Sequence, residues 1–286
     1  MTQLPIGILG STGHLGTRVA KLLGKAGAPH VLFARDPDSP HVPRQDSTID
    51  VRRADYADAA SLRAAFDGIG TLLMVSAVES PERLAWHGAI IDAAGATGVQ
   101  HIVYASFMGA APDATFTFAR DHFATEQLLE AAAKAGGPSF TALRDNFYLD
   151  VLIEFVGPDG VLRGPAGEGR VSAVARDDVA AVAAVVVQDP GTYAGQRLDV
   201  TGREALSMSD VAALIEDHTG RPTRFVDESD EEAYASRAHY GAPQWQVDAW
   251  VSTYTAIRSG ELAEISDTVE RLTGRRAKTL ADLLRR

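Results

Sequence analysis

The chain has 286 residues, of which 45% are hydrophobic, and it contains no cysteine. This composition is typical of a folded globular protein, and the absence of cysteine excludes disulfides, iron–sulfur clusters and thiolate zinc sites. A formal net charge of −11 disfavours nucleic acid as a partner, because an acidic surface repels a phosphate backbone. No apolar run is long enough to cross a membrane, so we expect a soluble, cytoplasmic protein.

The first 155 residues alternate apolar runs with helical patterns. Strands are expected at 5–9, 30–34, 48–53, 71–76, 101–106 and 140–143. Helices are expected at 14–26, 81–97 and 118–135. Strands separated by helices predict βαβ units, and therefore an α/β fold with a doubly wound, mostly parallel sheet and helices on both faces.

The pattern changes after residue 155. Residues 157–169 are rich in glycine and proline, which predicts a loop or hairpin. Helices are then expected at 176–187, 209–218, 230–239, 247–259 and 269–272, with one strand at 197–201. We expect residues 156–286 to form a smaller, mostly helical C-terminal lobe that is partly interleaved with the sheet.

A glycine-rich loop joins the first expected strand to the first helix. Its spacing, GxxGxxG, suits a tight turn, close approach of the backbone to a pyrophosphate, and close packing of the helix on the strand. The helix N-terminus would present free N–H groups to the phosphates. This predicts that residues 1–155 are a Rossmann-type NAD(P)-binding domain, with cofactor contacts from Gly10, Ser11, Thr12, Gly13, His14, Leu15 and Gly16.

The end of the second strand selects between NAD and NADP. Arg35 lies where many NAD sites have an acidic residue, and its guanidinium suits a 2′-phosphate. We therefore predict NADP(H); the alternatives are that Arg35 is a solvated turn residue or that Asp36 binds the ribose. Asp55 and Tyr56, after the third strand, are expected beside the adenine, although Asp55 is equally suited to cap the next helix.

Several segments together resemble the NmrA-like branch of atypical short-chain dehydrogenases/reductases, and most closely its type 2 NAD(P)H:quinone oxidoreductases and triphenylmethane reductases. The resemblance covers nearly the whole chain, and its H-x-x-T-E and L-R-[ND]-x-x-Y segments are more specific than the glycine loop. The matching segments are 10–16, 35–37, 54–56, 99–106, 122–126, 143–148, 175–180 and 199–202.

The resemblance implies further contacts with the nicotinamide half of the cofactor. They would come from Val75, Ser76, Ala77, Ser106, Phe107, His122, Asp145, Asn146 and Phe147. Two positions depart from the closest members, which often carry Asn at the position of Asp145 and small polar residues at 76–78. Asp145 in place of Asn affects whether this side chain contacts the nicotinamide through an amide group. The difference at 76–78 affects the shape of the substrate pocket.

The usual short-chain dehydrogenase dyad, Tyr-x-x-x-Lys, is absent. None of the four lysines lies four residues after a tyrosine, and the aligned helix has Phe118 and His122 at those positions. Alcohol oxidation by the usual route is therefore disfavoured. Hydride transfer to a quinone or a cationic dye demands less, because the acceptor is electron-poor and water can supply any proton.

Three residues are candidates for direct roles in catalysis. His122 and Glu126 are spaced i, i+4, so a Glu-oriented imidazole is expected to bind the nicotinamide ribose or deliver a proton, unless the pair is purely structural. Asn146 is the only asparagine in the chain. Tyr148 lies at the carboxyl end of a strand, where α/β sheets bind ligands, and is either a hydrogen-bond donor to the acceptor or a packed aromatic.

Aromatic residues suggest how a planar substrate would be held. Phe107 and Phe147 are expected just past strand ends and are candidates for stacking. The histidine spacing gives no metal motif, so no metal is expected. We predict an NADPH-dependent reductase for a small planar acceptor, and a homodimer stays open. The alternative is a non-catalytic NADP(H)-binding redox sensor that acts through a protein partner.

Overall fold

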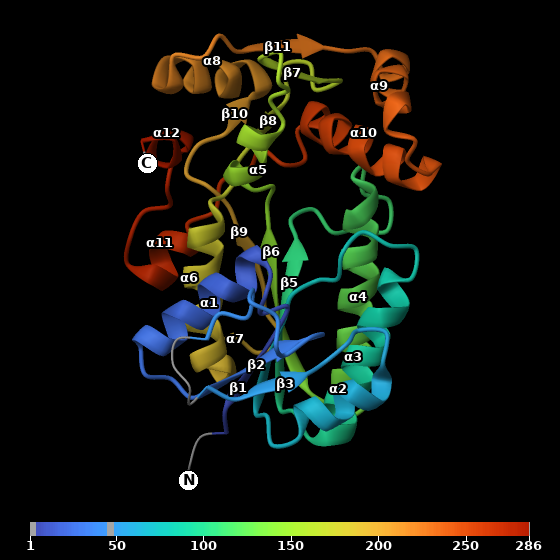
Figure 1. Cartoon of the computed structure of the whole chain (residues 1–286), viewed down its shortest axis with the longest axis vertical. Coiled ribbons are helices and arrows are strands. Elements are labelled where there is room, and N and C mark those ends of the chain that lie inside the picture. The colour runs from blue at the N-terminus through green and yellow to red at the C-terminus, as the bar shows by residue number, and fades with distance from the viewer. Residues whose placement is uncertain (1–3, 45–48, 286) are drawn as a thin grey trace. The chain divides into compact units, whose positions relative to one another are not determined.

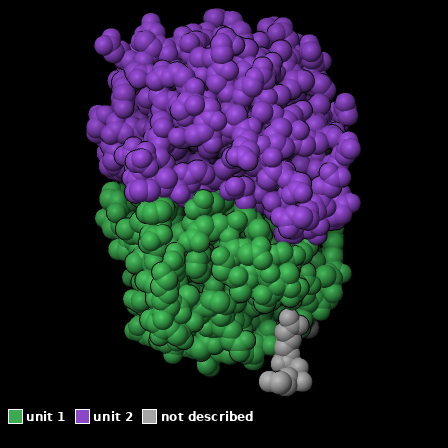
Figure 2. Space-filling model, turned by 180° about the vertical axis from the view of Figure 1, so that it is seen from behind, with its two compact units in different colours: residues 1–106, 121–144, 179–198 green, residues 107–120, 145–178, 199–286 purple. Residues whose placement is uncertain are grey.

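The computed structural model describes residues 4–44 and 49–285, and the chain forms two compact units (Figure 2). Unit 1 comprises residues 1–106, 121–144 and 179–198, and unit 2 comprises residues 107–120, 145–178 and 199–286. The chain therefore crosses between the units repeatedly rather than once near residue 155. The assignment of a cofactor domain to 1–155 and a substrate lobe to 156–286 stays a prediction.

A seven-stranded parallel sheet, in the order β3-β2-β1-β4-β5-β6-β9, confirms the predicted fold class. Its strands are β1 (Ile6–Leu9), β2 (His30–Ala34), β3 (Val51–Arg53), β4 (Thr71–Met74), β5 (His101–Phe107), β6 (Ser139–Asp145) and β9 (Arg197–Val200). Most are continuous apolar runs, as expected of strands covered on both faces. The predicted third strand began at Thr48, which lies outside the described residues.

The strand expected at 197–201 is present as β9, which is the edge strand of the main sheet, next to β6. The amide N–H groups of Ala142 and Asn146 donate to the carbonyls of Gln196 and Val200 respectively, so the two strands run in the same direction. Its predicted neighbours in sequence are helical, which concealed its place in the sheet.

Helices flank the sheet on both sides (Figure 1). One side carries α1 (His14–Lys25), α6 (Arg176–Gln188) and α7 (Pro190–Tyr193), and the other carries α2 (Ala59–Phe66), α3 (Arg83–Thr97) and α4 (Thr117–Lys134). The sequence analysis did not identify α2. Its N-cap, Asp58, accepts hydrogen bonds from the amides of Ala60 and Ser61 and so defines where the helix begins.

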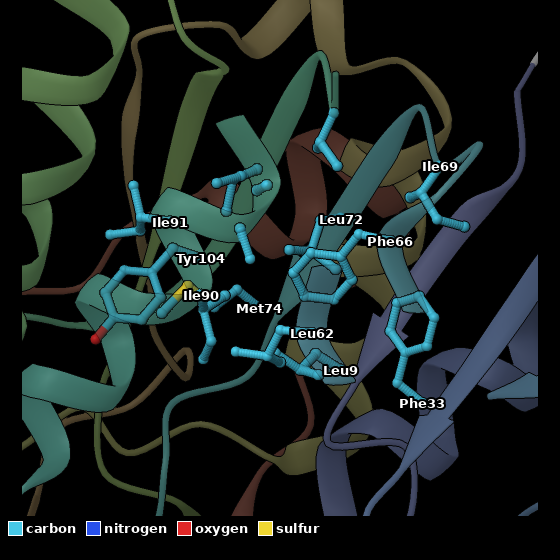
Figure 3. Packing of buried hydrophobic residues seen from close by; sticks show 14 of the residues in the cluster. Leu9, Phe33, Leu62, Phe66, Ile69, Leu72, Met74, Ile90, Ile91 and Tyr104 are labelled. Atoms are coloured by element: carbon cyan, nitrogen blue, oxygen red, sulfur yellow. The ribbon is translucent and has the colours of Figure 1, made fainter. Parts of the chain in front are cut away.

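One hydrophobic cluster of unit 1 lies between the sheet and the helices α2, α3 and α4 (Figure 3). Phe33 on β2 and Phe66 at the end of α2 pack with their ring centroids 5.3 Å apart. Tyr104 is fully buried on β5, where its ring packs edge-on against the His87 imidazole of α3. Burial of these large side chains is the main stabilising contribution to the sheet.

Among its described residues, unit 2 consists mostly of helices, with four short strands. Its helices are α5 (Leu149–Glu154), α8 (Met208–Thr219), α9 (Asp230–Arg237), η1 (Ala238–Tyr240), α10 (Gln244–Ser259), α11 (Thr268–Thr273) and α12 (Leu280–Leu284). Its short strands are β7 (Val161–Gly164), β8 (Arg170–Val171), β10 (Leu206–Ser207) and β11 (Arg224–Asp227). β7 pairs in parallel with β11, so the segment 157–169 is not the hairpin that was one of the expectations.

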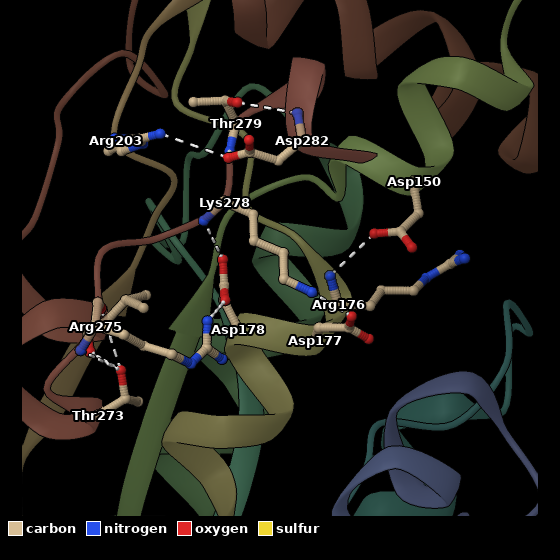
Figure 4. A network of polar contacts seen from close by, with 11 residues as sticks. Asp150, Arg176, Asp177, Asp178, Arg203, Thr273, Arg275, Lys278, Thr279 and Asp282 are labelled. Atoms are coloured by element: carbon tan, nitrogen blue, oxygen red, sulfur yellow. Dashed lines mark hydrogen bonds and ion pairs between the residues drawn. The ribbon is translucent and has the colours of Figure 1, made fainter. Parts of the chain in front are cut away.

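A buried carboxylate ties the start of α6 to the C-terminal segment (Figure 4). Asp178 is fully buried and accepts hydrogen bonds from the Arg275 guanidinium at 2.5 Å and the Lys278 amide at 2.6 Å. The Lys278 ammonium in turn contacts Asp177 at 2.6 Å. These contacts satisfy a charge that would be costly to bury alone, and they fix residues 275–278 on unit 2.

Candidate active site

The glycine loop follows β1, beside the strand β4. The order of strands reverses here, because β2 and β3 lie on one side of β1, while β4, β5 and β6 extend from the other side. Such a switch point leaves a crevice at the carboxyl ends of the two central strands, which is where open α/β sheets bind ligands. Unit 1 therefore places the predicted cofactor loop at the expected location.

Each glycine of the loop has a distinct structural role. Gly10 has a φ of +77°, a conformation that favours glycine. A Cβ on Gly16 would lie 2.2 Å from the Gly10 carbonyl oxygen, so this glycine allows α1 to pack on the turn. A Cβ on Gly13 would meet only that same oxygen, at 3.4 Å, and would otherwise project into open space.

The open space at Gly13 lies at the N-terminus of a twelve-residue helix. Gly13 is the N-cap of α1 and provides no side chain to bond the N–H groups of the first turn. Those groups and the positive end of the helix dipole suit a phosphate. Gly13, Thr12 and His14 are exposed, so a ligand has access to this backbone.

Two loop residues are used for packing instead. Ser11 is fully buried, and its hydroxyl donates to the Phe33 carbonyl at 2.8 Å, which ties the loop to β2. The Thr17 hydroxyl donates to the Ser11 carbonyl at 2.9 Å. The Leu15 side chain is 7% exposed and points into the core. Only the backbone of Ser11 and Leu15 is thus suited to the predicted cofactor contact.

Arg35 follows β2 directly and is exposed. It forms no hydrogen bond or ion pair with residues 4–44 or 49–285 that would restrict its guanidinium. Asp36, the alternative ribose ligand, accepts a hydrogen bond from the Asp38 amide at 3.0 Å, a local turn contact. The geometry therefore favours Arg35 over Asp36 as the residue that reads the 2′-position.

Tyr56 and Val75 contact the glycine loop. The Tyr56 hydroxyl donates to the Val75 carbonyl at 3.0 Å, and both residues lie within 3.3 Å of the position that a Cβ on Gly10 would take. Asp55 is not the helix cap that one alternative proposed, since that role belongs to Asp58. Its carboxylate accepts from the Ala57 amide at 3.1 Å.

The sequence analysis missed the residue that anchors the segment after β4. His87 accepts a hydrogen bond from the Ala77 amide at 2.9 Å through Nε2, and its Nδ1 contacts the Thr125 hydroxyl at 2.8 Å. Burial lowers the pKa of His87 to about 3, with a smaller contribution from Arg83, so the ring is neutral. It thereby positions the predicted cofactor residues Ser76 and Ala77.

The His122 imidazole contacts Arg83 and Tyr104, whereas the i, i+4 spacing predicted Glu126 as its partner. Its Nε2 lies 3.0 Å from the Arg83 guanidinium and its Nδ1 lies 2.8 Å from the Tyr104 hydroxyl. A guanidinium only donates, so Nε2 accepts and Nδ1 carries the ring proton. Burial, together with the charge of Arg83, holds the pKa of His122 well below its usual value. A neutral imidazole bonded at both nitrogens is poorly suited to deliver a proton.

Glu126 pairs with two arginines rather than orienting His122. Its carboxylate, fully buried, accepts from Arg144 at 2.7 Å and from Arg197 at 2.8 Å. The Ser106 hydroxyl also donates to it, at 2.6 Å, so this predicted cofactor residue has a structural partner. Burial raises the pKa of Glu126, but the bonds from Arg144 and Ser106 outweigh that effect and leave the pKa lowered.

In unit 2, the Asn146 side chain joins separate segments of the chain through hydrogen bonds. Its amide nitrogen donates to the Ser172 hydroxyl and the Leu262 carbonyl, both at 2.9 Å, and contacts the Met108 sulfur at 3.3 Å. Its oxygen accepts from the Phe147 amide at 2.7 Å. The side chain is 1% exposed, so this geometry favours a positioning role over direct contact with a substrate.

Asp145 and Tyr148 form a hydrogen-bonded pair at the end of β6. The Tyr148 hydroxyl donates to Oδ2 of Asp145 at 3.0 Å, while Oδ1 is buried and has no hydrogen-bond partner. Burial raises the pKa of Asp145 well above its usual range, and the bond from Tyr148 offsets this only in part. Burial and the neighbouring carboxyl likewise raise the pKa of Tyr148 well above its usual value.

The two phenylalanines predicted to stack on a substrate pack on each other. The Phe107 and Phe147 ring centroids are 4.9 Å apart, and Phe116 contacts both rings, at 4.9 and 5.0 Å. Phe107 is the last residue of β5 rather than beyond its end, and it is buried. Phe147 is half-buried, so of the two it retains the more accessible surface.

Residues 4–44 and 49–285 contain no group of three or more histidine, aspartate or glutamate side chains that would hold a metal ion. In the same part of the chain, no helix combines the length and the apolar character needed to cross a membrane.

Comparison with known proteins identifies the family. The chain matches the model of the NmrA-like family over residues 2–248. It is 31% identical to an NAD(P)H azoreductase of Xenophilus azovorans, over 96% of this chain and 95% of that protein.

Solved structures agree with this. An NADPH complex of an NADPH-dependent quinone oxidoreductase from Escherichia coli superposes with a TM-score of 0.88 at 30% identity, covering 98% of both chains. A triphenylmethane reductase of Citrobacter sp., complexed with NADP(H), gives 0.85 at 25% identity, also over 98% of both chains. This chain belongs to the NmrA-like family.

Proposed function

We propose that this chain transfers hydride from NADPH to a planar, electron-poor acceptor such as a quinone. Family membership, together with the azo- and quinone-reducing relatives that match it from end to end, makes it an NAD(P)H-dependent oxidoreductase. The observation that carries the proposal is the glycine loop at the β1/β4 switch point, where the exposed Gly13 backbone leaves space for a pyrophosphate.

The residues present fit NADPH. The loop backbone over 10–16 would hold the pyrophosphate, and Arg35 would bind the 2′-phosphate. When bound, the cofactor supplies a hydride. The chain's own contribution is to hold two flat reactants together, with the segment 75–77 kept in place by the neutral His87. This role requires no Tyr-Lys dyad.

A direct test measures oxidation of NADPH with benzoquinones, naphthoquinones, an azo dye and a cationic triphenylmethane dye, with NADH run in parallel. We expect turnover with at least one class of acceptor and a preference for NADPH. Tight binding of NADPH without turnover of any acceptor would instead favour the redox-sensor alternative. Absence of NADPH binding would overturn both.

A further inference from the structure

We propose that Asp145 and Tyr148 form a proton-donating pair: Tyr148 protonates the oxygen of an acceptor that has received a hydride, and Asp145 replaces the proton that Tyr148 gives up. This inference rests on the proposed function. It names a protein source for the proton that was otherwise expected to come from water.

The first support is that the surroundings of Asp145 suit a neutral acid. The side chain is 2% exposed, and no arginine, lysine or histidine among the described residues forms an ion pair with it. One carboxyl oxygen lacks any hydrogen bond. An ionised carboxylate would be strongly penalised in such a place, whereas the uncharged carbonyl oxygen of a carboxylic acid is tolerated.

The second support is the contact between the two groups. A phenol and a neutral carboxylic acid can each donate or accept a hydrogen bond. The 3.0 Å contact between Tyr148 Oη and Asp145 Oδ2 can therefore form with either group as the donor. With the proton on Asp145, the Tyr148 O–H is free to point elsewhere. Tyr148 is half-buried, whereas Asp145 is buried, so the tyrosine is the member that can meet a ligand.

The groups around Tyr148 favour this direction of transfer. The Arg176 guanidinium lies 5.4 Å from the centre of the tyrosine ring and favours a developing negative charge, while the Asp150 carboxylate opposes it. A lone phenolate here would be unstable. Transfer from Asp145 as Tyr148 donates avoids that state, and the burial penalty on the resulting Asp145 carboxylate favours its rapid reprotonation by water.

The proposed step balances in atoms and charge. A quinone that accepts one hydride, with its electron pair, from NADPH becomes a hydroquinone monoanion, and NADPH is oxidised to NADP⁺. A new O–H bond then forms on the anionic oxygen as the Tyr148 O–H bond breaks. The Asp145 O–H bond breaks as the Tyr148 O–H bond forms again, and water later returns a proton to Asp145.

The chemistry of two acceptors provides the test. A cationic triphenylmethane dye becomes neutral on accepting hydride and needs no proton, whereas a quinone needs one. We therefore expect Asp145→Asn and Tyr148→Phe each to lower the ratio of quinone turnover to dye turnover by about tenfold or more. Loss of a general acid often costs more than this, but water can also protonate the quinone product and so reduces the loss. Asp217→Asn, which removes an exposed carboxylate on α8 that plays no part in the proposed pair, should leave the ratio unchanged.

Two further readouts separate proton donation from a structural role. In the wild type, quinone turnover should fall as pH rises through the pKa of Asp145, because the donor form is lost, and Asp145→Asn should lack this limb. Infrared spectra of the free protein at neutral pH should show a protonated-carboxyl band that Asp145→Asn removes. An unchanged ratio in both variants, or an ionised Asp145 at neutral pH, would overturn the proposal.

The tests also distinguish this proposal from the function on which it rests. If the wild type reduces both acceptors and the variants affect them equally, the pair is structural and the reductase remains. If the wild type reduces neither acceptor although it binds NADPH, the proposed function fails, and the donor role fails with it. The infrared band reports on the neutral acid in either case.

Discussion

Among single residues, Gly13 and Gly16 of the same loop differ in whether the surrounding protein has room for a side chain. Gly13 has backbone angles that any residue adopts, and an added Cβ clears the protein at 3.4 Å. Gly16 has no such room, since its Cβ would lie 2.2 Å from a backbone oxygen. The first glycine thus leaves space for a ligand, and the second allows the fold to close.

This contrast predicts separate effects of two substitutions. Gly13→Val should weaken NADPH binding by at least about tenfold, while the free energy of unfolding stays within about 1 kcal/mol of wild type. Gly16→Ala should instead lower the free energy of unfolding by about 2–3 kcal/mol through overpacking. Calorimetric titration and urea unfolding measure the two quantities. Tight NADPH binding by Gly13→Val would refute the cofactor site.

Arg35 gives a second prediction at this scale. Arg35→Ala removes a charge-assisted contact with the 2′-phosphate, so the Kd for NADPH should rise by about tenfold or more. The Kd for NADH, which lacks that phosphate, should change little. Lys25→Ala, which removes an exposed cation at the other end of α1, is the matched control. Equal effects of Arg35→Ala on both cofactors would contradict the assignment.

At the scale of elements, a buried carboxylate joins three parts of unit 1. Glu126 on α4 binds Arg144 near the end of β6 and Arg197 at the start of β9. The edge strand β9 is therefore held to its helix by charge as well as by the sheet. Removal of the charge leaves two guanidinium groups without their shared acceptor.

Glu126→Gln should lower the free energy of unfolding by roughly 3 kcal/mol, since both arginines are partly buried. Glu130→Gln changes a carboxylate that lies one helical turn further on and is partly exposed to water, so it should lower the free energy of unfolding far less than Glu126→Gln does. Urea unfolding of the two variants tests this. Similar losses in both would show that burial of Glu126 does not matter.

Elements of the sheet could be predicted because their residues carry the signal locally. Thr71–Met74 is a continuous apolar run, and the glycine loop lies next to the strand that it follows. The strands β7 and β11 could not be predicted in this way, because their four residues, VLRG and RFVD, mix apolar with charged side chains and are only partly buried. Such short mixed segments leave little periodicity in the sequence.

The site shows the same division between local and distant signals. Gly10, Gly13 and Gly16 were identified from their spacing and their position between the first strand and the first helix, and the structure shows a positive φ at Gly10, open space at Gly13 and close packing at Gly16. The His122–Glu126 spacing predicted a mutual contact, but arginines from other elements compete for both side chains. His87 was missed because its contact with the Ala77 amide depends on how α3 packs beside β4.

At the scale of the whole molecule, buried neutral histidines make stability depend on pH. Burial lowers the pKa of His87 to about 3 and of His101 to about 4, and holds that of His122 well below the usual value. The unfolded chain therefore binds more protons than the native one as pH falls below 6.5. Asp145 works in the opposite direction, because its raised pKa keeps a proton on the native state.

Each such histidine should lower the free energy of unfolding by about 1.4 kcal/mol for each unit of pH below its unfolded pKa. His87→Gln removes one of these histidines. Between pH 6.5 and about 3, the free energy of unfolding of this variant should therefore fall less steeply with decreasing pH than that of the wild type, and the two slopes should differ by this amount. Urea unfolding at a series of pH values measures both curves. Parallel curves would mean that His87 is protonated in the native state.

The repeated crossing of the chain between its two units has an evolutionary consequence. Each unit is assembled from three separate stretches of sequence, with junctions at 106/107, 120/121, 144/145, 178/179 and 198/199. A single genetic crossover therefore cannot exchange one unit while preserving the other. The two units are therefore inherited together, and each changes through substitutions within its own three stretches.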